Sequence, residues 1–120
     1  MKNTHLDYLQ TEICNLDKLT EILFARYDKT IENKDLKEIS FIFDEIFLKM
    51  ENINKIFNEI YPKLVKNIAC REIKKYIILL NQNLNMEKSD LSYQIYYNSG
   101  ILVYCNFHLL YFSNFLKYKK

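Results

Sequence analysis

Cys105 and His108 are the residues whose types and spacing come nearest to a reactive or metal-binding pair. Because they are three residues apart, both would lie on one face of a helix. There a thiolate and an imidazole can bind zinc or act as nucleophile and base. Zinc needs three or four ligands, so Cys14, Cys70 or His5 would have to converge from other segments. The sequence indicates no third group that would orient the histidine for catalysis, and no oxyanion site. We therefore expect a buried thiol and a hydrogen-bonded histidine.

Carboxylates give no second candidate for catalysis or metal binding. The acidic residues are scattered along the chain, and the Glu-x-x-His motif of di-iron bundles does not occur. The single glycine, Gly100, excludes the glycine-rich loops that bind phosphates and dinucleotides. We predict no catalytic residue, no metal, no cofactor and no enzymatic activity.

The composition restricts the fold to helices. A chain of 120 residues suits a single domain over 1–120, and 49% hydrophobic residues are enough for a core. Sheet proteins need glycine or proline at their turns, and this chain has one of each. Three cysteines do not make a disulfide scaffold, and the first residues lack a signal-peptide pattern, so we expect a cytoplasmic protein.

Two helices are predicted in the first half of the chain. From about Thr4 to Tyr27 apolar residues recur on one face, and Lys29–Asn33 is interpreted as a connection. The second pattern is the strongest, because its apolar residues alternate by three and four without a miss. Its members are Leu36, Ile39, Phe43, Ile46, Met50, Ile53, Phe57, Ile60 and Leu64.

Two more helices are predicted in the second half. Pro62 either breaks or kinks the helix, since proline cannot donate a backbone hydrogen bond, and we predict a break near Tyr61. A third helix would run from Pro62 to about Leu84 with an apolar face of Val65, Ala69, Ile73, Tyr76, Leu80 and Leu84. A fourth would begin at Ser89 or Asp90. Together they predict an all-α, antiparallel four-helix bundle, most simply up-down-up-down.

The fourth predicted helix is apolar on every side, since residues 91–116 contain no Asp, Glu, Lys or Arg. Besides its core face it has two further stripes: Tyr97, Ile101, Tyr104, His108, Tyr111 and Phe115, and Tyr93, Tyr96, Val103, Phe107 and Leu110. A four-helix bundle leaves one face of each helix in water. Aromatic rings on that face would form a patch of about 400–500 Å².

Three interpretations of this patch are open. Its tyrosines can lie at the bundle edge with their hydroxyls in water, or the patch can be a contact face for a second copy or a different protein. A membrane span is the third, and eight polar side chains in the stretch argue against it. The contact face is favoured, and aromatic anchors dominate such interfaces. The predicted contact residues are Tyr93, Tyr96, Tyr97, Tyr104, Phe107 and Tyr111.

The net charge of +2 does not imply a polyanionic partner, but the charges are unevenly distributed. Residues 1–61 carry eight Lys or Arg against twelve Asp or Glu, whereas residues 62–120 carry nine against three. A solvated face inflated by lysine-rich codon usage explains this pattern most simply. The alternative is a nucleic-acid-binding assembly subunit that uses a basic face of the third predicted helix, formed by Lys63, Arg71, Lys74 and Lys75.

The function favoured by these patterns is that of a non-enzymatic protein-interaction module, acting as a stoichiometric binder or inhibitor. Small helical proteins of AT-rich bacteria and their phages often act in this way, as antitoxin or immunity proteins or as anti-CRISPR inhibitors. This expectation depends on size, composition and the aromatic fourth helix, and no motif selects one member of the class.

Overall fold

Four helices form the described part of the chain in the computed structural model, which describes residues 4–33, 36–84 and 91–118. They are α1 (Thr4–Asn33), α2 (Leu36–Leu64), α3 (Ile68–Leu84) and α4 (Leu91–Tyr118). Side chains are described for residues 5–26, 38, 40–84 and 100–116. The all-α prediction is confirmed, although residues 29–33 belong to α1 and not to a connection.

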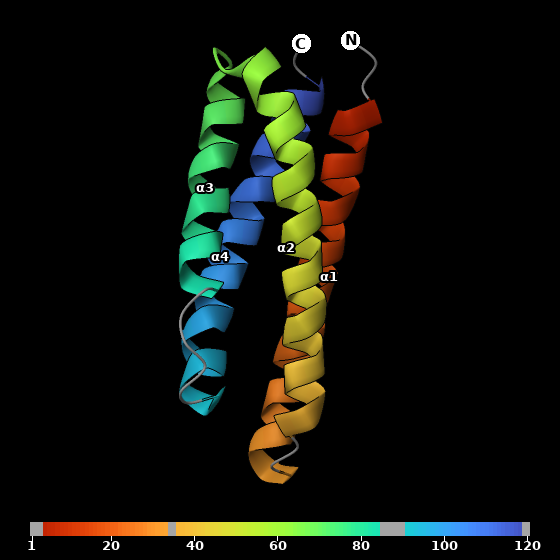
Figure 1. Ribbon diagram of the computed structural model, residues 1–120. Coiled ribbons are helices and arrows are strands. Elements are labelled where there is room, and N and C mark those ends of the chain that lie inside the picture. The colour runs from red at the N-terminus through yellow and green to blue at the C-terminus, as the bar shows by residue number, and fades with distance from the viewer. Residues whose placement is uncertain (1–3, 34–35, 85–90, 119–120) are drawn as a thin grey trace.

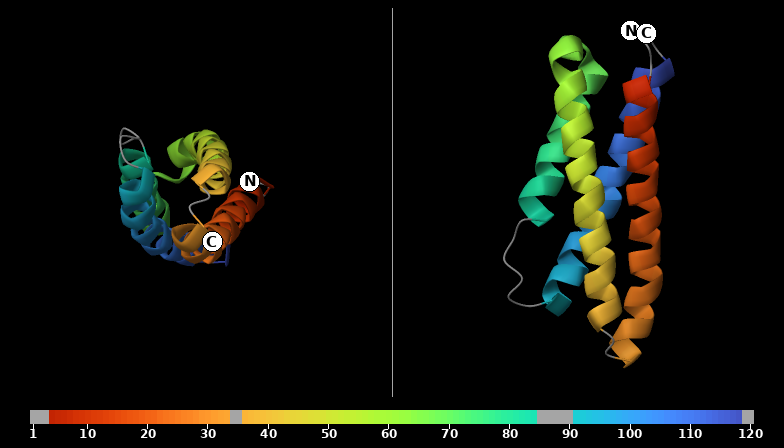
Figure 2. Two further views of the ribbon diagram at one scale, coloured as in Figure 1. Left: turned by 90° about the horizontal axis from the view of Figure 1, so that it is seen from below. Right: turned by 45° about the vertical axis from the view of Figure 1, so that its right-hand side comes forward.

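The helices run up and down in chain order, so that α1 begins and α4 ends at the same end of the bundle (Figure 1). α1 packs against both α2 and α4, and α3 packs along α4, whereas α2 and α3 touch only slightly. The bundle is elongated, measuring 49 × 22 × 19 Å, and its helices surround a common interior (Figure 2). The predicted antiparallel four-helix bundle is confirmed, and it consists of two hairpins joined mainly through α1 and α4.

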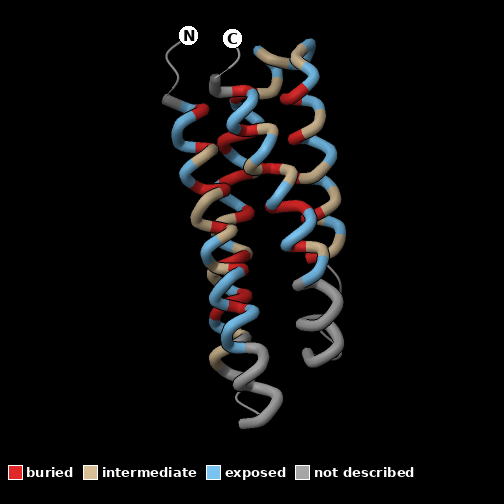
Figure 3. Tube along the Cα trace, turned by 180° about the vertical axis from the view of Figure 1, so that it is seen from behind, coloured by how far each residue is buried: buried red, intermediate tan, exposed pale blue. Residues whose placement is uncertain are grey.

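The core is formed by the predicted apolar faces, and buried residues alternate with exposed ones along each helix (Figure 3). In α2 the alternating pattern is confirmed from Phe43 to Ile60, where all six of its members are buried. The other helices contribute further apolar side chains, among them Ile73 and Leu80 of the predicted third face, and Leu9, Ile13, Leu16, Leu102 and Leu109. The pattern of threes and fours therefore places most of the core correctly, although Leu64 and Tyr76 of the predicted faces are only partly buried.

The predicted break near Tyr61 is wrong, because α2 continues through Pro62 to Leu64 and α3 begins only at Ile68. Pro62 lies in the last turn of α2 and is exposed. It removes one backbone donor where the helix is about to end, and water can satisfy the freed carbonyl group. Val65 consequently lies in the connection and is exposed, not on an apolar helix face as predicted.

Asn67 determines where α3 begins. Its side-chain Oδ1 accepts a hydrogen bond from the backbone N–H of Cys70 at 3.2 Å, and its backbone carbonyl accepts one from the N–H of Arg71 at 3.1 Å. These are the two hydrogen bonds of an N-cap residue, for which asparagine is among the best side chains. The cap at Asn67 therefore starts the helix later than a proline at its first position would.

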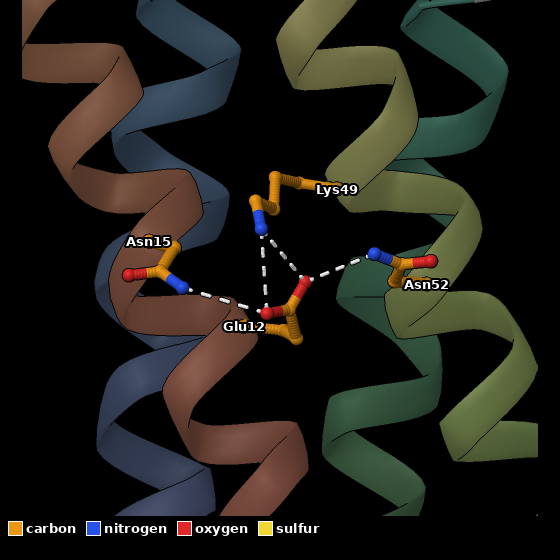
Figure 4. A network of polar contacts seen from close by, with 4 residues as sticks. All are labelled: Glu12, Asn15, Lys49 and Asn52. Atoms are coloured by element: carbon orange, nitrogen blue, oxygen red, sulfur yellow. Dashed lines mark hydrogen bonds and ion pairs between the residues drawn. The ribbon is translucent and has the colours of Figure 1, made fainter.

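A network of polar side chains joins α1 to α2 (Figure 4). Glu12 as a whole residue is only 4% exposed, and its carboxylate accepts hydrogen bonds from Lys49 Nζ and Asn52 Nδ2 of α2. Asn15 Nδ2 lies 3.4 Å from Glu12 Oε1, and Lys49 Nζ lies 3.2 Å from Glu12 Oε2. Because these partners lie at fixed levels on two helices, the network favours one register of α1 against α2.

The contact between α1 and α4 also contains polar pairs. The amide Nδ2 of the fully buried Asn106 donates to Thr20 Oγ1 at 2.8 Å, and Thr20 Oγ1 donates to the carbonyl of Leu16 at 2.9 Å. Nearer the chain termini Gln10 donates to Asn114. Asn106 Oδ1 has no hydrogen-bond partner within the described part of the chain. The two hairpins are thus joined by an apolar seam with a polar layer inside it.

Candidate protein-binding surface

The outer side of α4, opposite the core, is apolar, as its uncharged sequence predicts. Figure 3 views the molecule from the side on which α4 lies. Among the side chains of α4 that the structure describes, residues 100–116, five apolar ones on this side are more than 40% exposed. A rotation of 100° per residue places them within about 120° of one another. We call them the aromatic face: Val103, Tyr104, Phe107, Tyr111 and Phe115.

Rings from α3 and α4 support one edge of the aromatic face. Tyr76 of α3 stacks on His108 with 4.4 Å between ring centroids, and it meets Tyr104 edge-on at 5.9 Å. His108 Nδ1 donates to the backbone carbonyl of Tyr104 at 2.8 Å, and its ring packs edge-on against Phe107 at 5.4 Å. Because His108 is held from both sides, the exposed rings of Tyr104 and Phe107 rest on an ordered support. Such preorganisation lowers the entropy lost on binding.

The aromatic face is about as large as the largest apolar patch of a typical monomer. Four rings that are about half exposed, each with about 150–250 Å² to cover, leave roughly 400–500 Å² of aromatic surface in water. The largest apolar patch on a typical monomer is about 300–600 Å² and often functional. One partner of a standard protein interface contributes about 800 Å². The aromatic face alone therefore supplies about half of such an interface.

The predicted contact residues divide into two groups. Three of them are exposed on the aromatic face: Tyr104, Phe107 and Tyr111. The other three lie outside the residues whose side chains are described: Tyr93, Tyr96 and Tyr97. Val103 and Phe115 complete the face although they were not among the predicted contacts. Both belonged to the apolar stripes of the uncharged stretch, which gave no reason to rank them below the tyrosines.

Cys105 and His108 have different surroundings. Cys105 is fully buried in the core, whereas His108 stacks against Tyr76 beside the aromatic face. Cys70 is buried on α3, and Cys14 is partly buried on α1. Within the described ranges, no three His, Cys, Asp or Glu side chains are grouped so that they could hold a metal ion.

Thiol reactivity is expected to separate Cys14 from the other two cysteines. Burial raises the pKa of the Cys105 thiol to about 11, and it raises the pKa of Cys70 as well. About one Cys105 thiol in a thousand is then ionised three pH units below that value, and the thiolate is the reactive form. We expect an aromatic disulfide reagent to modify Cys14 in the folded protein, and Cys70 and Cys105 only after unfolding in urea. Equal rates for all three thiols would contradict the buried positions.

The same burial predicts how stability depends on pH. An unfolded thiol loses its proton near pH 9.0, whereas folded Cys105 retains it to about 11. The folded chain therefore binds more protons between these values, and the free energy of unfolding falls as the pH rises through this window. Urea unfolding at a series of pH values checks the direction, and Cys105→Ala is expected to flatten the slope. A slope that is unchanged in this variant would contradict the assignment to Cys105.

All four residues of the predicted basic face are exposed: Lys63, Arg71, Lys74 and Lys75. The prediction of one helix for all four is wrong, because α2 continues through Pro62 and Lys63 therefore belongs to α2, whereas the other three lie on α3. Two of the four have partners within the chain. Lys75 Nζ lies 2.8 Å from Glu72 Oε1, and Lys74 Nζ lies 4.2 Å from the ring centroid of Tyr61. A lysine paired with a carboxylate contributes less positive potential to phosphate binding. The basic face is therefore a weaker candidate than the aromatic face.

A surface hollow lies between α1 and α2, lined by His5, Tyr8, Asn52, Lys55, Ile56 and Glu59. His5 Nε2 lies 3.3 Å from Glu59 Oε2, and both side chains are more than half exposed. Exposed pairs of this kind are common on protein surfaces and contribute little. Ligand sites, by contrast, are concave and mostly apolar with a few converging polar groups. The aromatic face therefore remains the candidate site.

The aromatic face is interpreted from its own geometry and chemistry. In the ranges that the structure describes, no helix combines the length and the hydropathy needed to cross a membrane. No protein-family model matches the sequence, and no curated protein or solved structure matches it significantly.

Proposed function

We propose that this protein is a non-enzymatic interaction module, a stoichiometric binder or inhibitor, that binds another protein through the aromatic face of α4. The observation that carries the proposal is the exposure of four rings on a helix without a charged residue over 91–116. Covering roughly 450 Å² of apolar surface is worth about 10 kcal/mol before the losses of association are subtracted. That amount is of the same order as the about 4–15 kcal/mol that association costs, and the apolar surface that the partner covers adds to it.

Phe107 is the anchor expected to contribute most. It is 67% exposed, it lies in the middle of the aromatic face, and its ring packs on His108. Tyr104 and Tyr111 flank it and carry hydroxyl groups that can form hydrogen bonds at the rim of an interface. Aromatic residues are enriched in protein interfaces, and charged residues are depleted at the centre of such interfaces. A nucleic acid would instead use the basic face, which lies mainly on α3.

Capture of a partner tests the proposal. Tagged protein expressed in its native host is expected to retain a partner in stoichiometric amount, identified by mass spectrometry. Phe107→Glu places a charge at the centre of the contact and is expected to weaken binding at least about 30-fold, the effect of losing an interface hot spot.

Phe41→Glu is the matched control. Phe41 lies on the outer side of α2 and is 64% exposed, so that both variants exchange an exposed phenylalanine for a carboxylate. We expect this variant to retain the partner. Capture that Phe107→Glu and Phe41→Glu reduce equally, or capture of nothing by the unmodified chain, would contradict the proposal.

A further inference from the structure

The outer side of α4 contains a second seam with the spacing of a helix-packing face. Gly100, Tyr104, Phe107 and Tyr111 follow one another at steps of four, three and four, and all four are exposed. The same alternation on the opposite side of α4 forms its core contact with α1 and α3. Alternation by three and four is the pattern with which one helix packs lengthwise on another. The occupant that this seam fits is therefore a helix.

We propose that this helix is α4 of a second copy, packed antiparallel across the seam. This inference rests on the proposed function and names the partner of the aromatic face. A two-fold axis at the level between residues 105 and 106 maps Gly100, Tyr104, Phe107 and Tyr111 onto one another, because their steps of four, three and four read the same in both directions. It places Tyr104 opposite Phe107 of the second copy, and Gly100 opposite Tyr111 of the second copy. An isologous contact of this kind closes into a dimer.

Gly100 selects the antiparallel orientation. It is exposed in the middle of a helix, and a Cβ atom built on it meets no heavy atom within 4 Å. The outer side of α4 therefore has open space beside Gly100, and the antiparallel register brings the bulky ring of Tyr111 to that level. A parallel pair would instead place two glycines opposite each other and leave a void between the helices. Packed interfaces alternate large and small side chains and leave few voids.

The charge and the area of the seam also favour a second copy. Because residues 91–116 contain no Asp, Glu, Lys or Arg, two identical helices can approach without like charges meeting. The rings of two copies together present roughly 800–1,000 Å² of aromatic surface, to which Gly100 and Val103 add. This lies below the about 1,200–2,000 Å² of standard interfaces and within the range of weak, transient contacts. A dimer with a dissociation constant in the micromolar range is expected, on the order of 10 µM.

Sedimentation velocity tests the dimer. The purified chain is expected to change from monomer to dimer between about 1 and 100 µM, the range that brackets this dissociation constant. Phe107→Glu is expected to raise the dissociation constant at least about 30-fold and to sediment as a monomer, whereas the Phe41→Glu control dimerises like the unmodified chain. A monomer at every concentration, or a dimer that Phe107→Glu does not weaken, would overturn the inference.

Disulfide trapping tests the register. In a Cys14→Ser background the remaining cysteines, Cys70 and Cys105, are buried. Chains that carry Gly100→Cys and chains that carry Tyr111→Cys are expected to form a disulfide-linked dimer under mild oxidation when they are mixed. Neither chain is expected to form one alone. A disulfide-linked dimer of Gly100→Cys chains by themselves would show the parallel arrangement and overturn the antiparallel one.

The two proposals can fail separately. A monomeric chain whose partner capture still depends on Phe107 overturns the second copy as occupant and leaves the proposed function standing. A monomeric chain whose capture does not depend on Phe107 overturns both. A dimer trapped through Gly100→Cys and Tyr111→Cys supports the second copy as occupant, and a dimeric chain that captures no other protein overturns the proposed binder or inhibitor alone.

Discussion

Replacing Thr20 with valine is expected to destabilise the fold by about 1–3 kcal/mol, although the volume of the side chain hardly changes. The hydroxyl of Thr20 accepts a hydrogen bond from Asn106 Nδ2 at 2.8 Å, and both residues are buried. Asn106 Oδ1 already has no partner among the described residues. Thr20→Val therefore leaves the amide nitrogen unsatisfied as well, and an unpaired buried donor carries its full desolvation penalty.

The double variant Thr20→Val, Asn106→Leu is expected to be at least as stable as the unmodified chain. It removes the whole buried polar pair, including the carbonyl oxygen that has no partner, and replaces it with apolar groups of similar size. Urea unfolding followed by far-ultraviolet circular dichroism measures the three free energies. A double variant less stable than Thr20→Val would show that Asn106 contributes through something other than its bond to Thr20.

The arrangement of the core could be predicted because it depends on local spacing. From Phe43 to Ile60 the steps of three and four keep every apolar residue on one side of α2, whatever packs against it. Leu9, Ile13 and Leu16 of α1 follow the same rule. Helix spacing therefore predicts four buried faces and the bundle that must cover them.

The connection and the polar layer could not be predicted, because they depend on competition and on distant contacts. Pro62 and Asn67 both favour a helix start, and the two hydrogen bonds of the Asn67 cap decide between them. Asn106 and Thr20 are 86 residues apart in sequence. Nothing in the local pattern of either residue indicates the other, so only the packing of α1 on α4 reveals the pair.

The apolar character of the candidate site could be predicted from the sequence, but the contacts that support it could not. The absence of charge from residues 91–116 indicates that an outer face of α4 must be apolar, and Tyr104, Phe107 and Tyr111 are indeed exposed. The support that His108 receives from Tyr76 depends on how α3 lies against α4. Spacing within one helix contains no information about that contact.

Lys49→Met is expected to destabilise the protein by about 2–3 kcal/mol, because it leaves the buried carboxylate of Glu12 without its cation. Removing one partner of a fully buried pair destabilises by about 3–5 kcal/mol. The side chain of Lys49 is 27% exposed and that of Glu12 is 6% exposed, so that water reaches one end of this pair and moderates the effect. The amide of Asn52, 3.2 Å from Glu12 Oε2, does not replace the charge.

Two further variants isolate burial as the cause. Lys75→Met breaks a shorter pair, since Lys75 Nζ lies 2.8 Å from Glu72 Oε1, but the Lys75 side chain is 70% exposed. We expect it to change the free energy of unfolding by no more than about 0.5 kcal/mol. The double variant Glu12→Leu, Lys49→Met removes both buried charges and is expected to regain most of the loss. If Lys49→Met is no more destabilising than Lys75→Met, the Glu12 network behaves as a surface contact, and the register of α1 on α2 is set by apolar packing alone.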